Sequence, residues 1–384
     1  MQYKINPKNG DKLSILALGA MRLPKDEAER MDLIRRAVDS GVNYIDTAYL
    51  YPGSEAALGR ALTEGYRDRV VLADKLPPYL VKKNADIEKI FSKQLERLQT
   101  DRIEYYMIHM LPTAAEWQRL CDLGLLDWVA EQKKAGRIKN FGFSYHGGVP
   151  AFEQLIDAWD WDFCMIQYNY YDENKQAGKR GLRYATEQGI PVMVMEPLRG
   201  GWLANRLPKE AQAVWEAASQ KRSPAEWALR WVWNQPQPLT VLSGMSSMEV
   251  LEENLRIAAE VQPGALTEED MARYESVRNI IAEKTQVACT GCNYCMPCPA
   301  GVDIPMCFTS LNDQALLGKM SAQMNYIIRA YNHNASLCTQ CGACEKHCPQ
   351  QLAVREELKK VKKALEGPTY KPFRFGIKTF MRLK

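Results

Sequence analysis

The chain has 384 residues, of which 46% are hydrophobic and 25% are charged, and its formal net charge is +4. This length exceeds one average domain and supplies ample apolar material for a large buried core. So small a net charge argues against a nucleic-acid-binding protein, and the sequence has neither an export signal nor a long apolar run, so we expect a cytoplasmic protein without a membrane span.

Short apolar runs alternate with amphipathic stretches from the N-terminus to about residue 265. A hairpin is expected first, with strands over 2–5 and 11–13 around Asn9-Gly10, and it would close the bottom of a barrel. Eight strands follow, and each precedes at least one helix. The predicted strands are 13–17, 42–45, 70–74, 103–108, 138–143, 163–166, 191–195 and 239–242. The predicted helices are 27–40, 54–64, 85–98, 117–135, 150–158, 179–188, 209–219, 225–233 and 248–259.

The predicted strands are continuous apolar runs, which is typical of parallel strands with both faces buried. Eight strand-then-helix units indicate a closed (β/α)8 TIM barrel, an α/β fold that takes about 250 residues. We therefore assign residues 1–265 to a barrel domain.

The alternation of strands and helices ends beyond Pro263-Gly264, and residues 266–384 form a second predicted domain. Helices are expected over 267–284, 306–313 and 321–332. The tail from Gly367 is basic and aromatic and contains no acidic residue. Three roles are open for it: it packs its aromatic side chains on the body, docks an acidic electron-transfer partner, or attaches to a membrane surface.

Eight of the eleven cysteines lie in two quartets within this second domain. Each quartet begins with three cysteines at two-residue gaps and ends in Cys-Pro, the pattern of two-cluster ferredoxins, in which the fourth cysteine ligates the other cluster. The quartets are Cys289, Cys292, Cys295 and Cys298, then Cys338, Cys341, Cys344 and Cys348. We expect two [4Fe–4S] clusters with crossed ligation, and the long helical gap of 299–337 predicts a mostly α-helical ferredoxin-like domain.

Two other interpretations of the cysteines are less favoured. C-x2-C pairs also build zinc sites, but a zinc site uses two pairs and not two quartets. Disulfide frameworks suit small secreted chains. The remaining cysteines, Cys121, Cys164 and Cys307, are expected to be ordinary buried thiols.

Four polar residues follow predicted strands two, three and four: Asp46, Tyr51, Lys75 and His109. Catalytic residues of (β/α)8 barrels lie at these C-terminal strand ends, so we expect the four side chains to converge on one mouth. A phenol has a pKa of about 10, and a neighbouring ammonium lowers it. Asp46 would hold Lys75, His109 would hydrogen-bond a carbonyl oxygen, and Tyr51 would donate a proton as hydride reaches carbon. Each residue alone also suits a structural role, and it is the set that favours catalysis.

The sequence from Asn43 to Glu55, with its NYIDTA, Tyr51 and GSE elements, resembles the aldo/keto reductase signature, and Lys75 and His109 match that family's other catalytic positions. The similarity covers the whole barrel, and the cysteine domain makes the chain resemble the ferredoxin-fused aldo/keto reductases. The resemblance implies NAD(P)-dependent reduction of a small carbonyl substrate, or the reverse oxidation of an alcohol, with NADPH or NADH as the cofactor.

The resemblance also implies contacts to the cofactor from later strand ends. The implied residues are Ser144, Gln167, Pro197, Leu198, Arg199, Gly244, Ser246, Ser247, Glu253 and Asn254. Those after strands five and six would hold the carboxamide, those of 197–199 the pyrophosphate, and the remainder the adenosine end. Family members strict for NADPH have basic residues at the positions of Gly244 and Val250, which are not basic here, so the choice between NADH and NADPH stays open.

Two classes of function remain open on the sequence alone. The chain is either this enzyme or an electron-transfer iron–sulfur protein whose barrel is a scaffold or a nucleotide sensor, and the intact set of four residues favours the enzyme. Nicotinamide transfers two electrons together, whereas iron–sulfur clusters transfer one at a time. A flavin at the barrel mouth would couple the two kinds of electron transfer, although the sequence has no flavin fingerprint. Alternatively, the clusters would exchange electrons with a redox partner protein.

Overall fold

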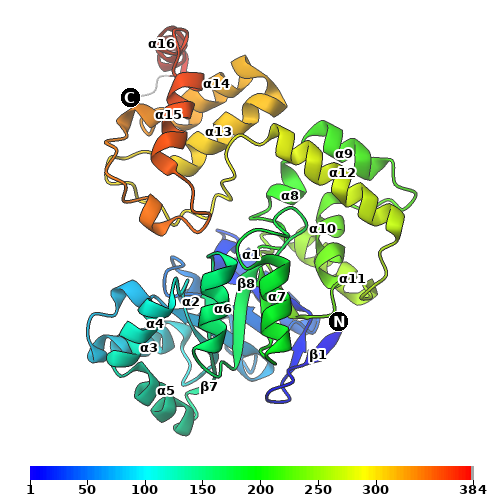
Figure 1. Ribbon diagram of the computed structural model, residues 1–384, viewed down its shortest axis with the longest axis vertical. Helices are drawn as coiled ribbons and strands as arrows, with labels where there is room; N and C mark the ends of the chain where they lie inside the picture. Colours follow the sequence, from blue (N-terminus) through cyan, green and yellow to red (C-terminus); the bar gives the residue numbers. More distant parts are fainter. Residues whose placement is uncertain (382–384) are drawn as a thin grey trace. The chain divides into compact units, whose positions relative to one another are not determined.

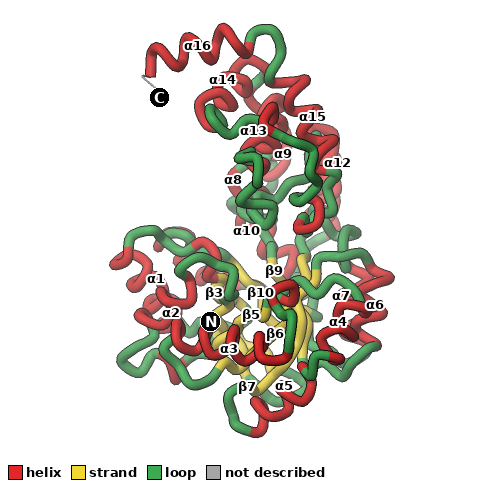
Figure 2. Tube along the Cα trace, turned by 90° about the vertical axis from the view of Figure 1, so that its left-hand side faces the viewer, coloured by secondary structure: helices red, strands yellow, loops and turns green. Residues whose placement is uncertain are grey.

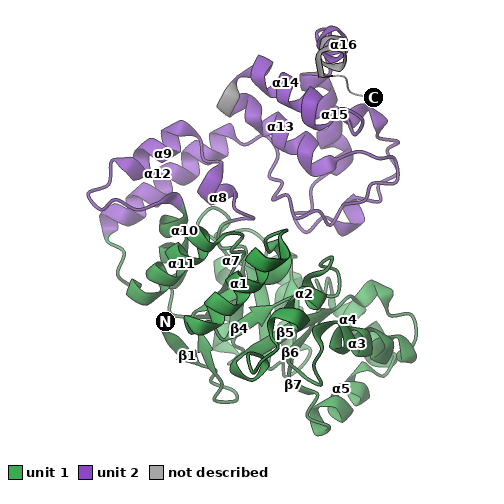
Figure 3. Cartoon of the chain, turned by 180° about the vertical axis from the view of Figure 1, so that it is seen from behind, with its two compact units in different colours: residues 1–198, 225–267 green, residues 199–224, 268–384 purple. Residues whose placement is uncertain are grey.

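A computed structural model describes residues 1–381 of the chain. The described chain divides into two compact units, one of residues 1–198 and 225–267 and the other of residues 199–224 and those from 268 onward (Figure 3). The domain boundary at residue 265 stays a prediction. In the structure, residues 199–224 belong to the second unit, although the residues that precede and follow them in the sequence belong to the barrel unit.

The first unit is a closed barrel of eight parallel strands, as predicted (Figure 2). Around the barrel the strands follow the order β10-β3-β4-β5-β6-β7-β8-β9. They are β3 (Leu16–Gly19), β4 (Tyr44–Asp46), β5 (Val71–Leu76), β6 (Ile103–Ile108), β7 (Ile138–Tyr145), β8 (Phe163–Gln167), β9 (Val192–Met195) and β10 (Pro238–Ser243). Because all eight run in parallel, their C-terminal ends open at one rim, which is where barrel enzymes place their chemistry.

Helices surround these strands (Figure 1). They are α1 (Glu27–Asp39), α2 (Ser54–Ala61), α3 (Asn84–Leu98), α4 (Ala114–Asp122), α5 (Leu125–Lys134), α6 (Val149–Asp157), α7 (Gly178–Glu187), α10 (Pro224–Trp233) and α11 (Met248–Glu260), with short 3₁₀ helices η1 (Ala20–Arg22), η2 (Arg67–Arg69) and η3 (Pro78–Leu80). The single helix predicted over 117–135 is wrong: it is two helices. Gly124 has a φ of 82°, a left-handed conformation that interrupts the helix and that glycine adopts without steric cost.

A hairpin of β1 (Tyr3–Ile5) and β2 (Lys12–Ser14) precedes the barrel, as predicted. Asn6 donates to the hydroxyl of Tyr105 at 2.9 Å, and that hydroxyl donates to Asp11 at 2.9 Å. Asn9 donates to the side-chain oxygen of Asn140 at 2.6 Å. Tyr105 and Asn140 lie in the N-terminal halves of β6 and β7, so the hairpin closes the end of the barrel opposite the rim.

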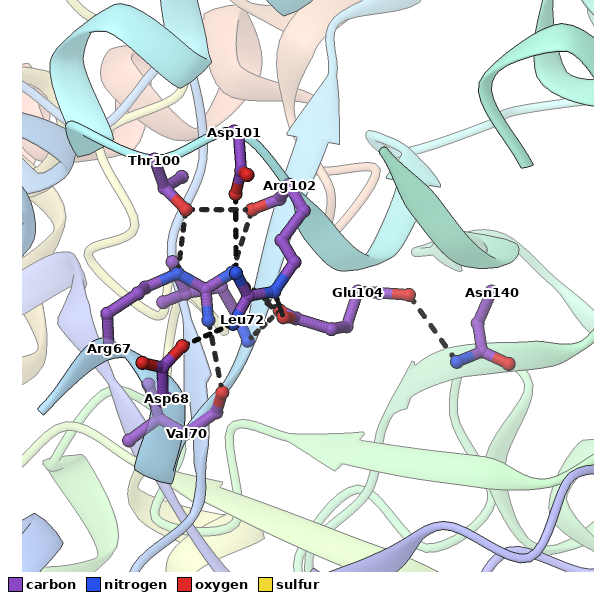
Figure 4. Close-up of polar contacts among 9 residues, drawn as sticks. All are labelled: Arg67, Asp68, Val70, Leu72, Thr100, Asp101, Arg102, Glu104 and Asn140. Atoms are coloured by element: carbon purple, nitrogen blue, oxygen red, sulfur yellow. Dashed lines mark hydrogen bonds and ion pairs between the residues drawn. The ribbon is translucent and has the colours of Figure 1, made fainter. Parts of the chain in front are cut away.

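A polar network fixes the N-terminal ends of β5 and β6 (Figure 4). The Arg67 guanidinium donates to both carboxylate oxygens of Glu104 at 2.9 Å. Arg102 Nε and the backbone N–H of Leu72 also donate to this carboxylate, at 3.0 and 2.9 Å. Arg67 and Arg102 line a hollow of about 730 Å³. This hollow lies at the N-terminal strand ends and therefore belongs to the structural end of the barrel.

Side chains fill the barrel interior. The interior cluster is Leu13, Ala17, Tyr44, Ala73, Tyr105, Met107, Phe163, Met165, Met193, Leu239 and Leu242. Alternate residues of a strand face the same side of a sheet. Because Tyr44, Ala73 and Met107 face inward, the residues two positions further along also face inward at the rim. These residues are Asp46, Lys75 and His109.

The regular secondary structure among the described residues of the second unit is helical, with loops that carry the cysteines between the helices, as predicted for a mostly α-helical ferredoxin-like domain. Its helices are α8 (Trp202–Asn205), α9 (Lys209–Glu216), α12 (Glu268–Lys284), α13 (Ile304–Leu317), α14 (Lys319–Arg329), α15 (Val354–Leu365) and α16 (Tyr370–Met381), with η4 (Ala335–Leu337) and η5 (Glu345–His347). Helix α12 packs on α9, where the rings of Tyr274 and Trp215 lie 5.0 Å apart. This contact joins the segment after β9 to the C-terminal helices.

An apolar core within α13, α14 and α15 supports the cysteine loops. Phe308, Leu311, Tyr326 and Val361 are at most 1% exposed in this core. Six cysteines of the two quartets pack against it: Cys289, Cys295, Cys298, Cys338, Cys344 and Cys348. Among the helices of residues 1–381, none combines the length and the apolar character needed to cross a membrane. The cytoplasmic location stays a prediction.

Candidate functional site

A buried ion pair lies at the rim between β4 and β5. The Lys75 ammonium is 2.5 Å from Oδ1 of Asp46 and donates to the backbone oxygen of Thr47 at 2.6 Å. The side chains of Lys75 and Asp46 are only 2% and 4% exposed. Burial raises the pKa of Asp46, and the Lys75 ammonium opposes that rise. The pair is thus fixed and water-excluded at the place where the sequence predicted it.

Tyr51 and His109 lie beside this pair. The Lys75 ammonium is 4.9 Å from the centroid of the Tyr51 ring, and this ring lies 6.0 Å from that of His109 at an angle of 86°. Burial lowers the pKa of His109 well below its ordinary value, and the charge of Lys75 lowers it further. The imidazole is therefore neutral near pH 7. The structure brings all four predicted residues together, and their catalytic roles stay a prediction.

Four non-glycine residues at or after the C-terminal strand ends have left-handed backbone. Met110, directly after His109, has a φ of 53°, Gln176, in the loop after β8, has a φ of 57°, and Glu196 and Arg199, after β9, have φ values of 54° and 50°. This conformation costs about 1–2 kcal/mol for each such residue. Strain of this kind persists where the surrounding structure imposes it and is concentrated at functional sites. The observation therefore favours these loops as the working part of the barrel.

Ser144 of β7 and Gln167 of β8 are buried on the inner face of the barrel. The hydroxyl of Ser144 accepts a hydrogen bond from the backbone N–H of Met110 at 2.8 Å. Gln167 donates to Asp172 at 3.0 Å and accepts from Gln176 at 2.9 Å. A hydroxyl and a primary amide form a donor and acceptor set that suits a carboxamide. The two residues therefore fit the nicotinamide contacts implied by the sequence.

His146 extends this network, although no sequence motif singled it out. Its Nδ1 lies 3.2 Å from Oε1 of Gln176. Burial lowers the pKa of His146 to about 4, with Lys75 lowering it as well and Gln176 raising it. Tyr145, in contrast, donates its hydroxyl to the backbone oxygen of Gly148 at 2.6 Å.

The segment after β9 was expected to hold the pyrophosphate. Pro197 is buried and Leu198 is half-buried. Arg199 is 1% exposed, and its Nη2 donates to the backbone oxygen of Ala288 at 2.8 Å, within the second unit. Ala288 directly precedes Cys289. One nitrogen of this arginine is therefore committed to the first cysteine loop, which the sequence did not indicate.

The residues expected at the adenosine end follow β10. Gly244 and Ser246 are exposed, and Glu253 is half-buried. The Ser247 hydroxyl caps α11 by accepting from the backbone N–H three residues on, at 3.4 Å. Asn254 is buried and donates to Oγ of the strand residue Ser243 at 2.7 Å. Gly244 and Ser246 are thus the accessible members of this set, while Ser247 and Asn254 also have structural roles.

Two arginines near α11 are held in ion pairs. Arg256 lies 2.6 Å from Glu226, and Arg36 lies 2.6 Å from Glu252. Neither occupies position 244 or 250, so nothing at this end of the site favours NADPH over NADH.

Cysteines from both quartets are neighbours in the second unit. Burial raises the pKa of the Cys295 thiol, and Cys292, Cys289 and Cys348 raise it further. Cys348 belongs to the second quartet, so this neighbourhood fits crossed ligation, and eight thiols are the donor set that two [4Fe–4S] clusters require. Among the described residues, no three cysteine, histidine or carboxylate side chains converge as they would around one metal ion.

The three other cysteines lie apart from this centre. Cys164 and Cys307 are buried, as expected, whereas Cys121 is only half-buried.

Comparisons with known proteins agree with this geometry. The family model described as "Aldo/keto reductase family" matches residues 15–279. A model described as "4Fe-4S dicluster domain" matches residues 288–353. The first match covers the barrel, and the second spans both cysteine quartets.

Curated relatives and solved structures match the barrel region at low identity. "Protein tas" of Escherichia coli K12 is 24% identical over 344 residues, covering 73% of this chain and 98% of its own length. "L-galactose dehydrogenase" of Arabidopsis thaliana is 24% identical over 306 residues, covering 70% of this chain and 91% of its own. The holo form of "aldo-keto reductase AKR11C1 from Bacillus halodurans" superimposes with a TM-score of 0.61 at 25% identity, covering 72% of this chain and 96% of the other.

Proposed function

This chain belongs to the aldo/keto reductase family and carries a 4Fe–4S dicluster domain, and we propose that its barrel catalyses NAD(P)-dependent reduction of a small carbonyl compound or the reverse oxidation of an alcohol. The observation that carries this proposal is the buried Lys75–Asp46 pair beside Tyr51 and His109 at the barrel rim. When bound, nicotinamide supplies the hydride. Ser144 and Gln167 have the polar groups to orient its carboxamide.

Tyr51 acts as the proton donor in this proposal. An ammonium near a phenol stabilises the phenolate, and the Lys75 ammonium lies 4.9 Å from the centroid of the Tyr51 ring. Asp46 and the backbone oxygen of Thr47 hold this ammonium in place. In the reverse direction the phenolate of Tyr51 accepts the proton from an alcohol.

His109 orients the substrate carbonyl. Because its pKa is lowered well below the ordinary value, its imidazole is neutral and can donate one N–H to a carbonyl oxygen without adding charge. Hydrogen bonds aimed at a developing oxyanion in a water-excluded site contribute a large part of catalysis in many enzymes.

The second unit is proposed to hold two [4Fe–4S] clusters. Cys289, Cys292, Cys295 and Cys348 would bind one cluster, and Cys338, Cys341, Cys344 and Cys298 the other. Each cluster carries one electron at a time. A flavin at the barrel mouth would connect this chemistry to hydride transfer, and its presence is tested by optical spectra of the anaerobically purified protein.

The variant Tyr51→Phe tests the barrel chemistry. We expect kcat for aldehyde reduction to fall by about 10²–10⁴, the usual contribution of a positioned proton donor. The dissociation constant of the cofactor should change little, since the hydroxyl acts in the transition state. Tyr49→Phe is the matched control, because Tyr49 lies under the Arg97 guanidinium at 4.8 Å and has no part in the proposed chemistry.

Wild-type turnover in Tyr51→Phe would refute the role of this tyrosine. Tight nucleotide binding by the wild type without turnover of any aldehyde or alcohol would instead identify the barrel as a nucleotide sensor.

A further inference from the structure

Residues of helices α15 and α16, which are labelled in Figure 1, line a hollow of about 950 Å³ in the second unit. Its wall includes Lys362 and Glu366 from the end of α15 and the turn after it, and Lys371 and Arg374 from α16. Ser336 of η4 forms another part of the wall. The hollow is therefore built from the basic tail and from a segment of the cysteine region.

The accessible charge of this hollow is positive. Lys362 and Lys371 are exposed, and the structure gives neither an ion pair with a described residue. Glu366 is the one carboxylate among the described lining residues, and it is directed inward. Its carboxylate accepts from the Tyr326 hydroxyl at 2.5 Å and from the Ser336 backbone at 3.2 Å, and also from the Ser336 hydroxyl. The two lysines are therefore exposed cations, and the half-buried Arg374 adds a third positive charge to the wall.

Aromatic side chains accompany these cations. Phe375 is 75% exposed, and the Arg374 guanidinium lies 4.7 Å from the centroid of the Tyr331 ring, which also lines the hollow. Aromatic residues and arginine are enriched at protein–protein interfaces. Opposite charges around such a centre steer a partner into register and raise the association rate.

The wall of the hollow leads directly to the second cysteine quartet. Ser336 lies in η4, which ends one residue before Cys338. The backbone N–H of Cys338 donates to the oxygen of Ala335 at 3.1 Å, and the N–H of Ala335 donates to the Tyr326 hydroxyl at 2.7 Å. The same tyrosine is bonded to Glu366. Hydrogen bonds therefore connect the charged wall to a proposed cluster ligand.

We propose that this hollow is the docking surface for a small acidic electron-transfer protein of the flavodoxin or ferredoxin class. The partner's reduced flavin or iron–sulfur centre would lose one electron to the cluster that Cys338, Cys341, Cys344 and Cys298 would hold. No bond to the chain forms or breaks in this step. A membrane surface would favour an amphipathic helix with one broad apolar face, whereas these cations surround a concave wall that continues to a cysteine ligand.

Charge reversal of the two exposed lysines tests the proposal in the intact, cluster-loaded protein. Stopped-flow absorbance would follow cluster reduction by a reduced acidic flavodoxin, and reduced methyl viologen would serve as a small reductant that needs no docking. We expect the Lys362→Glu/Lys371→Glu variant to lose about 10–100-fold in rate with flavodoxin at low salt. The methyl viologen rate, the iron content and aldehyde reduction should stay close to those of the wild type, because none of them depends on steering of a charged partner. The wild-type flavodoxin rate should fall as salt rises.

Lys209→Glu is the control, since it reverses one lysine charge, half of the change in the double variant, at an exposed position of α9 in the same unit. An unchanged flavodoxin rate in the double variant, or an equal loss in Lys209→Glu, would overturn the proposal. Failure of both flavodoxin and ferredoxin, in their reduced forms, to transfer an electron to the wild-type protein would also overturn it. Loss of binding to phosphatidylserine vesicles in the double variant, with the flavodoxin rate intact, would assign the tail to a membrane surface.

Discussion

Replacing Lys75 with methionine removes an ammonium from a site that water does not reach. The Asp46 carboxylate would lose its 2.5 Å partner and remain buried, and the backbone oxygen of Thr47 would lose its donor at 2.6 Å. Removing one partner of a buried ion pair typically costs about 3–5 kcal/mol, because an uncompensated charge is left in the interior. Solvent does not weaken the interaction between the two charges, since the side chains of Lys75 and Asp46 are only 2% and 4% exposed.

A loss of this size is large enough to measure in the intact protein. For a unit the size of this barrel, 1 kcal/mol corresponds to about 2–4 °C in Tm, so we expect Tm to fall by on the order of 10 °C. The double variant Asp46→Asn/Lys75→Met should recover most of this loss, because a neutral amide can stay buried at lower cost and can donate to Thr47. Both variants should be inactive in carbonyl reduction.

The pH dependence of Lys75→Met has a defined sign. With Lys75 gone, burial alone acts on Asp46 and holds its pKa above the ordinary value. A carboxyl with a raised folded-state pKa contributes stability that is present below its unfolded pKa and is lost as pH rises through the folded pKa. The deficit of Lys75→Met relative to the wild type should therefore be smaller at pH 5 than at pH 8. Thermal unfolding followed by tryptophan fluorescence under anaerobic conditions measures both effects. Wild-type stability in the single variant, or a double variant no better than the single, would refute the reasoning.

Two further predictions concern the network around the rim and the cysteine centre. The pKa of His146 is lowered to about 4, so the neutral imidazole contributes stability that is present above its unfolded pKa of about 6.5 and is lost as pH falls. The free energy of unfolding of the wild type should therefore fall by about 2 kcal/mol between pH 7 and pH 5 on this account, and that of His146→Gln should fall by less. Equal losses of the two proteins in thermal unfolding would contradict the assignment. If Cys348 and Cys289 bind the same cluster, the double variant Cys348→Ser/Cys289→Ser should lose no more iron than Cys289→Ser alone, roughly four atoms of about eight. Cys348→Ser/Cys338→Ser should lose nearly all iron while Cys307→Ser keeps it, and the reverse pattern in iron analysis would show uncrossed ligation.

The barrel was predictable because its strands are continuous apolar runs at regular spacing. The same spacing placed Asp46, Lys75 and His109 at strand ends, and the parity of a β-strand then requires them to face one mouth. The break at Gly124 was missed because apolar residues on both sides keep a helical period, and only the left-handed φ of this glycine separates the two helices. Helix α15 carries Val354, Leu358, Val361 and Leu365 at helical spacing, a signal that the cysteine pattern beside it obscured.

Contacts between distant segments could not be read from the sequence. The hydrogen bond from Arg199 to Ala288 joins residues 89 positions apart, and it assigns the segment after β9 to the unit that carries the cysteines. The partners of His146 depend on how the loop after β8 returns Gln176 to the barrel. Such contacts follow from the path of irregular loops, which no apolar periodicity specifies.

Transfer of a label from cofactor to substrate tests the proposed barrel chemistry most directly. The protein, purified without oxygen, would be incubated with NADH or NADPH deuterated at the reactive carbon and with a panel of aldehydes, and mass spectrometry would follow the alcohols. We predict one deuterium in the alcohol product with at least one of the two cofactors, and loss of this product in Tyr51→Phe but not in Tyr49→Phe. Alcohol that carries no deuterium, or a labelled product that forms equally well in Tyr51→Phe, would contradict hydride transfer assisted by this tyrosine.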